Sequence, residues 1–110
     1  MDKPATTPAP FAATLSERQL RFLRGRAHPL KPVVMLGQKG LTDNVVAETA
    51  QALRDHELIK VKLRVGDRTQ RDAVLASLVE RTGCTLVTRI GHVAVLYLAA
   101  KAPRLVMPDA

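Results

Sequence analysis

The stretch VVMLGQKGLTDNV, residues 33–45, passes from four apolar residues through a Gly-x-x-Gly step into the expected start of a helix. Its apolar run predicts a short buried strand, and Thr42 is suited to cap the helix that follows. A strand, a tight turn and a helix in this order form the unit from which α/β folds are built. The two glycines allow two explanations: a turn that needs glycine's backbone freedom, or a loop whose N–H groups hold a phosphate.

The patterns on either side of this stretch predict the other elements. The signals are the helical spacing of apolar residues and the alternation of apolar with polar residues. They give helices over residues 16–28, 43–55 and 67–83, and strands over 33–36, 58–65, 84–90 and 93–98. The order α-β-α-β-α-β-β predicts an α/β fold, a two-layer sandwich with a four-stranded mixed sheet, because helices that join strands pack against the sheet.

Composition divides the chain into one domain and two ends. Its 110 residues are enough for a single domain with its own core. Residues 1–13 are rich in alanine, proline and threonine, and residues 101–110 contain two prolines without periodicity. We therefore expect a flexible N-terminal tail over 1–13, one domain over 14–100 and a C-terminal tail over 101–110.

The charge of the chain points to a polyanionic partner. Seventeen Lys and Arg against ten Asp and Glu give a net charge of +7 and a pI near 10.3, above the value of about 9 that marks nucleic-acid-binding domains. The excess is concentrated in two segments: residues 15–40 carry six basic residues against one acidic residue, and residues 60–71 carry five against one.

The candidate RNA contacts are the Gly-x-x-Gly loop and the basic faces beside it. A Gly-x-x-Gly loop that clamps a nucleic-acid backbone is the device of KH domains. The basic residues of the first helix and of the strand over 58–65 could also be ordinary solvated faces, or a guard against edge pairing of strands. The predicted contacts are Gly37, Gln38, Lys39, Gly40, Arg18, Arg21, Arg24, His28, Lys31, Lys60, Lys62 and Arg64.

Aromatic residues are too few to form a stacking platform for bases. The chain has only Phe11, Phe22 and Tyr97, whereas the common single-strand readers stack bases on exposed aromatic rings. We therefore expect recognition of RNA through its backbone and shape, with structured RNA favoured over single strands. Composition leaves the choice between RNA and DNA open.

No catalytic or cofactor-binding pattern stands out. The three histidines have no zinc spacing, the glycine loop lacks the Gly-Lys-Ser/Thr ending of a P-loop, and Cys84, alone on a strand, is typical of a core residue. We expect no enzyme activity, cofactor, metal or small-molecule substrate. The lone cysteine and the lack of a long apolar run predict a cytoplasmic protein that does not bind membranes. A basic adaptor, or a general polyanion-binding module without RNA specificity, is the alternative function.

Five motifs follow one another along the chain: AHPLKPVV (27–34), GQKGLT (37–42), HELIKVK (56–62), IG (90–91) and VLY (95–97). With these motifs the chain resembles, over about residues 14–98, the YhbY family, the stand-alone bacterial form of the CRM (chloroplast RNA splicing and ribosome maturation) domain. It implies a fold like the C-terminal domain of translation initiation factor three, with a KH-like loop over residues 37–40. It also implies association with RNA of the large ribosomal subunit precursor. We expect a monomer.

Overall fold

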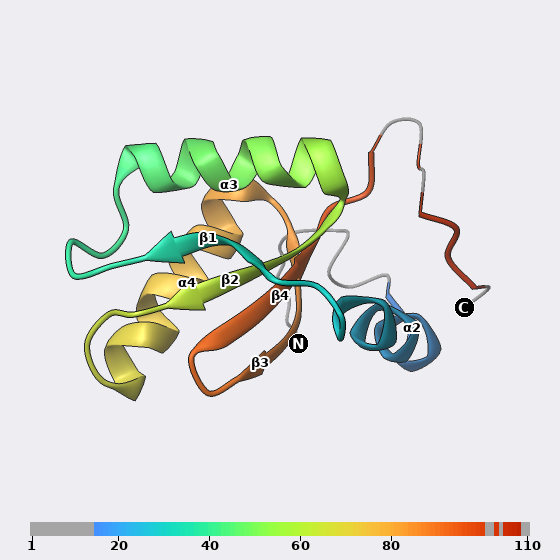
Figure 1. Ribbon diagram of the computed structural model, residues 1–110, viewed down its shortest axis with the longest axis horizontal. Helices are drawn as coiled ribbons and strands as arrows, with labels where there is room; N and C mark the ends of the chain where they lie inside the picture. The colour runs from blue at the N-terminus through green and yellow to red at the C-terminus, as the bar shows by residue number, and fades with distance from the viewer. Residues whose placement is uncertain (1–14, 101–102, 104, 109–110) are drawn as a thin grey trace, which may run out of the picture.

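The computed structural model describes residues 15–100, 103 and 105–108 (Figure 1). Within these residues the predicted order of elements is confirmed, and most boundaries agree with the prediction within two residues. The elements are α2 (Glu17–Ala27), β1 (Pro32–Leu36), α3 (Asp43–His56), β2 (Leu58–Leu63), α4 (Arg68–Thr82), β3 (Thr85–Ile90) and β4 (Val93–Tyr97).

The four strands form one mixed sheet in the order β1-β2-β4-β3. β1 and β2 are parallel, and α3 is the crossover that joins them. β4 runs antiparallel to both of its neighbours, so β3 is parallel to β2 with β4 between them. The predicted α/β fold with a four-stranded mixed sheet is therefore confirmed.

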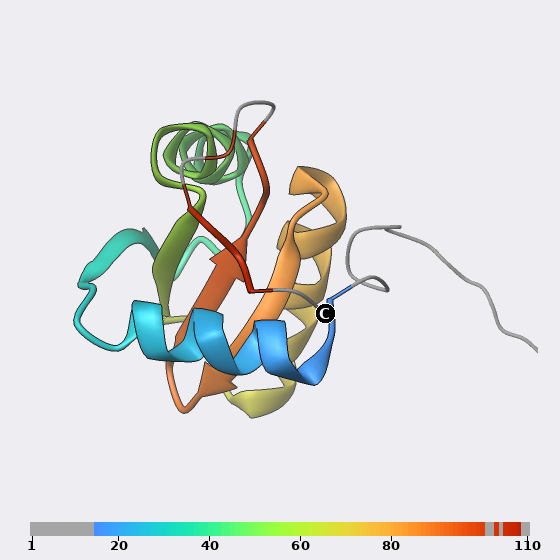
Figure 2. The same ribbon diagram turned by 90° about the vertical axis from the view of Figure 1, so that its right-hand side faces the viewer.

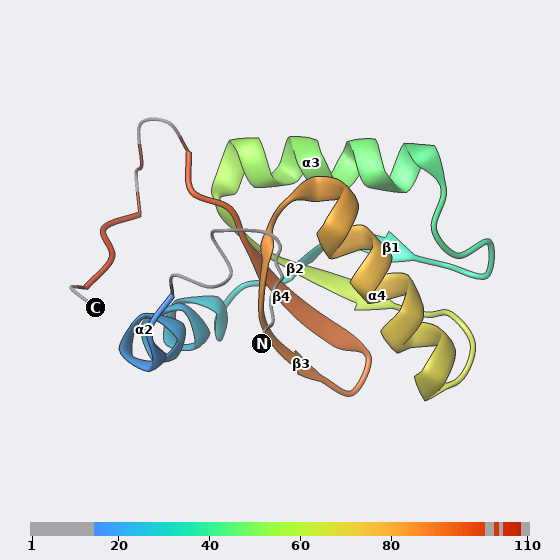
Figure 3. The same ribbon diagram turned by 180° about the vertical axis from the view of Figure 1, so that it is seen from behind.

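The main core lies between the sheet and the helices α3 and α4. Side chains alternate between the two faces along β2, so Ile59, Val61 and Leu63 lie on this face. They belong to the same core as Leu53 of α3 and Leu78 of α4. Figure 3 shows α4 in front of the sheet on this side. A strand with a period of two buries every second side chain, so the lysines that alternate with these residues must lie on the other face.

The helix α2 packs on that other face and covers only one end of it. Leu23 and Ala27 of α2 form a second core with Leu58, Val95 and Tyr97, which alternate with residues of the main core along β2 and β4. Figure 2 shows α2 and α4 on opposite sides of the sheet. The sequence predicted two layers and did not indicate this partial third one. The rest of the face, which we call the open sheet face, carries Met35, Lys60 and Lys62.

The chain after β4 is tied to the domain through Glu57. This residue follows α3 with a φ of 63° and is 1% exposed. Its carboxylate accepts hydrogen bonds from the backbone N–H groups of Ala100 and Leu105, at 3.3 and 3.1 Å. Leu105 and Met107 pack against the second core. Residues 105–107 thus contact the domain, although we expected the segment over 101–110 to be a tail; the predicted tail over 1–13 lies outside the described residues.

Cys84 lies one residue before β3 and is fully buried in the main core, as the sequence predicted. Burial raises the pKa of its thiol above the ordinary value of 9.0, and a hydrogen bond from the Thr82 hydroxyl opposes this shift. We predict that an aromatic disulfide reagent labels the folded protein at least about 100-fold more slowly than the urea-unfolded chain, because only an accessible thiolate reacts.

The same shift makes stability depend on pH. The unfolded thiol ionises first as the pH rises, so the contribution of Cys84 to the free energy of unfolding is complete below about pH 9 and is lost above it. Urea titrations at pH 7.5 and 10 measure this loss, and Cys84→Ala should make it smaller.

For the labelling experiment, a folded protein that reacts as fast as the unfolded chain would contradict the burial of Cys84.

Candidate nucleic-acid interface

The loop of residues 37–40 joins β1 to the N-terminus of α3. It is a tight turn, in which the Gly40 N–H donates to the Gly37 carbonyl at 2.9 Å. Thr42 caps the helix, its hydroxyl accepting from the Val45 N–H at 3.1 Å. Gln38 and Lys39 are exposed. The loop therefore presents a lysine beside the positive end of a helix dipole, which favours negative ligands.

The two glycines of this loop differ in what the fold demands of them. Gly40 has a φ of 71°, a backbone conformation that residues with a side chain rarely adopt. Gly37 does not have a φ in this region, and a Cβ added to it would meet no atom within 4 Å. A turn that needs glycine explains Gly40 and leaves Gly37 unexplained. The space beside Gly37 is open.

A groove of about 630 Å³ runs beside the loop, and we call it the basic groove. Gln38 lines it together with Lys62 of β2 and with Arg64, which follows that strand. No acidic residue is among the described residues that line it. The tertiary structure therefore brings together part of the loop and part of the basic strand, which the sequence predicted as separate candidates.

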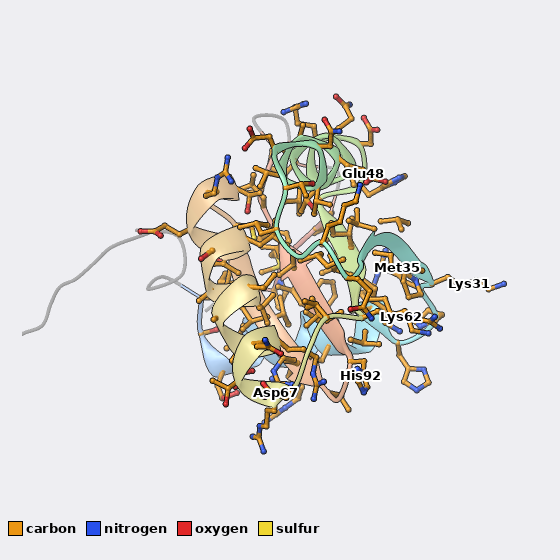
Figure 4. The ribbon with its side chains drawn as sticks, turned by 90° about the vertical axis from the view of Figure 1, so that its left-hand side faces the viewer. Lys31, Met35, Glu48, Lys62, Asp67 and His92 are labelled. Carbon is orange, nitrogen blue, oxygen red and sulfur yellow. The ribbon has the colours of Figure 1, made fainter. Side chains whose placement is uncertain are left out.

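His92 also lines the basic groove, and sequence reasoning assigned it no role. It lies in the turn between β3 and β4, with its Nδ1 atom 3.1 Å from the Leu63 carbonyl oxygen. Figure 4 shows Lys31, Met35, Lys62 and His92 along one side of the molecule. The sequence placed His92 only in the turn between two predicted strands; the pairing of the neighbouring Val93 with Lys62, which brings His92 to the groove, is visible only in the structure.

The basic surface continues from the groove toward α2. Lys60 lies on the same face of β2 as Lys62, and its ammonium donates to the carbonyl of His28 at 3.2 Å. His28 and Lys31 are exposed between α2 and β1. Lys60 therefore also satisfies a carbonyl at the C-terminus of α2, where cations are favourable.

The arginines of α2 form a separate part of this surface. Arg18, Arg21 and Arg24 are exposed, as expected for a basic helix face, and none of them lines the basic groove. Arg24 is paired with Glu17 at 3.8 Å. An exposed pair at this distance contributes little to stability and leaves the arginine available to a phosphate.

The described residues hold no group of three or more His, Cys, Asp or Glu side chains that could bind a metal ion. In the same part of the chain, no helix has the length and apolar character needed to cross a bilayer.

Comparison with known proteins identifies the family. The family model of the CRS1 / YhbY (CRM) domain matches residues 15–97. A Haemophilus influenzae relative, named as an RNA-binding protein, is 45% identical over 95 residues, covering 86% of this chain and 96% of the relative. The Bacillus subtilis relative named "Probable RNA-binding protein YqeI" is 38% identical over 87 residues, covering 79% of this chain and 91% of the relative.

A solved structure shares the fold as well. The solution structure of a hypothetical Staphylococcus aureus protein, proposed to bind RNA, is 28% identical and superimposes with a TM-score of 0.73. The match covers 86% of this chain and 100% of that one. Because the family model spans most of the chain and the fold agrees, the chain belongs to the CRS1/YhbY (CRM) domain family, as its motifs suggested.

Proposed function

We propose that this protein is a non-catalytic, cytoplasmic RNA-binding protein that holds RNA phosphates with residues 37–40 and the basic groove. The observation that carries the proposal is Gly37, a glycine that neither backbone conformation nor internal space requires. It lies near the exposed Lys39 and a groove whose lining, among the described residues, includes no acidic side chain. Relatives named as RNA-binding proteins support RNA as the polyanion.

Phosphate is the chemical group that best fits this surface. Lys62 and Arg64 in the basic groove supply cationic donors, and the N-terminus of α3 adds N–H groups that have no partner within the helix. Contacts to phosphates fix a protein on a nucleic acid but carry no sequence information. Binding should therefore follow the shape of the RNA, and affinity should fall steeply with salt.

The family resemblance supports a narrower role, in which the RNA belongs to the precursor of the large ribosomal subunit and the protein acts as a monomer in assembly. Sucrose-gradient sedimentation of cell extract tests this role. The protein should travel with particles smaller than the mature large subunit and leave them after RNase treatment. Sedimentation only at the top of the gradient would argue against it.

A general polyanion-binding module is the second candidate, and the net charge of +7 favours it. Such a module would bind a DNA duplex as tightly as RNA of the same length, because its affinity would depend on charge alone. Comparing a structured ribosomal RNA fragment with a matched DNA duplex over a salt series separates the two functions.

Two loop variants test the phosphate cradle, with RNA affinity measured by fluorescence anisotropy. Lys39→Asp should weaken binding about tenfold or more, because a charged hydrogen bond is lost and a repulsive charge is introduced. It should also reduce the slope of log affinity against log salt by about one unit. Gly37→Ala should weaken binding several-fold, because its methyl group would occupy the space of the approaching phosphate.

The control for Lys39→Asp is Arg54→Asp, which makes the same charge change on an exposed residue of α3. It should lose less affinity. The free energy of unfolding of Gly37→Ala should differ from that of the wild type by no more than about 1 kcal/mol, because the φ of Gly37 lies outside the left-handed region and the space around it is open. Normal RNA affinity in both folded loop variants would contradict the cradle.

A further inference from the structure

A second cavity lies at the opposite end of β1 from the loop of residues 37–40. It has a volume of about 370 Å³ and is lined by apolar side chains, including Leu30, Val33, Leu58 and Leu105. We call it the Leu30 pocket. Leu30 and Val33 are 38% and 48% exposed, so the pocket is open to solvent. Its volume lies at the small end of the range of about 300–1,000 Å³ typical of small-ligand sites.

The ionisable side chains that line this pocket are of the basic residue types. Arg26, Lys31 and His56 line it, and no acidic residue is among the described lining residues. The neighbouring Glu57 is buried, and its carboxylate accepts hydrogen bonds from the N–H groups of Ala100 and Leu105. A ligand that complements this pocket therefore has a flat or apolar body and carries negative charge.

Arg26 is held in a position that suits a planar ligand. Its guanidinium carbon lies 5.8 Å from the centre of the Phe22 ring, within the range of a cation–π contact. A guanidinium group is itself a plane on which unstacked RNA bases are known to stack. Arg26, supported by the Phe22 ring, thus offers at the pocket a stacking surface that the sequence, with so few aromatic residues, did not lead us to expect.

We propose that the Leu30 pocket takes one unstacked nucleotide of the bound RNA, with its base between the apolar lining and Arg26 and its phosphate near Lys31. This inference rests on the proposed function. It joins the pocket to the same basic surface, because Lys60 contacts His28, three residues before Lys31. It adds a preference that phosphate contacts alone cannot give: RNA with an extruded base should bind more tightly than a perfect duplex.

The test compares two RNA hairpins that differ only in one bulged nucleotide. Wild-type protein should bind the bulged hairpin about tenfold more tightly, since stacking of one base on a protein surface is worth about that factor. Leu30→Asn should abolish the preference and leave affinity for the perfect hairpin unchanged. Arg26→Lys should reduce the preference, because it keeps the charge and removes the plane.

Leu86→Asn is the matched control, because Leu86 is 39% exposed, close to the value for Leu30, and lies outside the pocket. It should keep the preference. A wild-type protein that binds both hairpins equally, or a Leu30→Asn variant that keeps the preference, would overturn the inference. The proposed function would survive either result if Lys39→Asp still weakened both hairpins, so the two failures are distinguishable.

Methyl NMR spectra supply an independent readout and separate RNA from a protein partner. Adding adenosine 5′-monophosphate should shift the methyl signals of Leu30, Val33 and Leu105 and leave those of Leu86 in place. Shifts of the same methyls by a peptide of alternating leucine and glutamate, with none from the nucleotide or the bulged hairpin, would overturn the inference in favour of an acidic protein segment.

Discussion

Replacing Lys62 and Arg64 together by glutamate is expected to weaken RNA binding about 100-fold or more at 0.15 M salt. Both residues line the basic groove beside Gln38 of the loop. Each charged contact to phosphate contributes about 1.5–3 kcal/mol, so the loss of two accounts for this factor before repulsion is added. The salt dependence should fall as well, by about two units in the slope of log affinity against log salt.

The matched control reverses the same number of charges on the other side of the sheet. Arg54 lies on α3 and Arg81 on α4, and both are exposed. The ion pair of Arg81 with Asp43 at 2.9 Å is also exposed and contributes little to stability. The double variant Arg54→Glu and Arg81→Glu should keep most of the affinity. Equal losses in the two double variants would show that only total charge matters, as the general polyanion module requires.

Replacing Leu96 by alanine is expected to lower the free energy of unfolding by about 3–5 kcal/mol. Leu96 is fully buried in the main core. It sits on β4, paired with Ile59 of β2 on one side and with Leu86 of β3 on the other. Hydrogen-bonded neighbours on both sides limit how far the backbone can move to close the cavity, which places the cost at the upper end of the range for such substitutions.

Urea denaturation followed by circular dichroism measures this loss. A domain of this size is typically stable by about 5–15 kcal/mol, so the variant should unfold at much lower urea or fail to accumulate. Val106→Ala is the control, because Val106 is 83% exposed and its substitution also removes only apolar atoms. A Leu96→Ala variant as stable as Val106→Ala would contradict the placement of β4 as one of the two central strands of the sheet.

The local elements and the family could be predicted from the sequence because their signals lie within a few neighbouring residues. Thr42, which the sequence predicted as a cap, is the N-cap of α3. The structure also has capping boxes at the starts of α2 and α4, formed by Ser16 with Gln19 and by Asp67 with Gln70, each within four residues of sequence. The alternation in β2 identified the core residues and the basic residues that lie opposite them. The spacing of apolar residues indicates which side of an element is buried, and this spacing can be read from the residues of that element alone.

The sequence by itself thus determined the elements and their order, and the alternation in β2 separated its buried residues from its basic ones. Only the tertiary structure decided that α2, unlike α3 and α4, packs on the other face of the sheet, that His92 joins Lys62 in the basic groove, and that Leu105 lines the Leu30 pocket. Leu105 reaches that position with the help of Glu57, a residue 48 positions away in the chain. Such contacts depend on which buried faces pack together. The local sequence pattern shows that a face is buried but does not specify the element against which it packs.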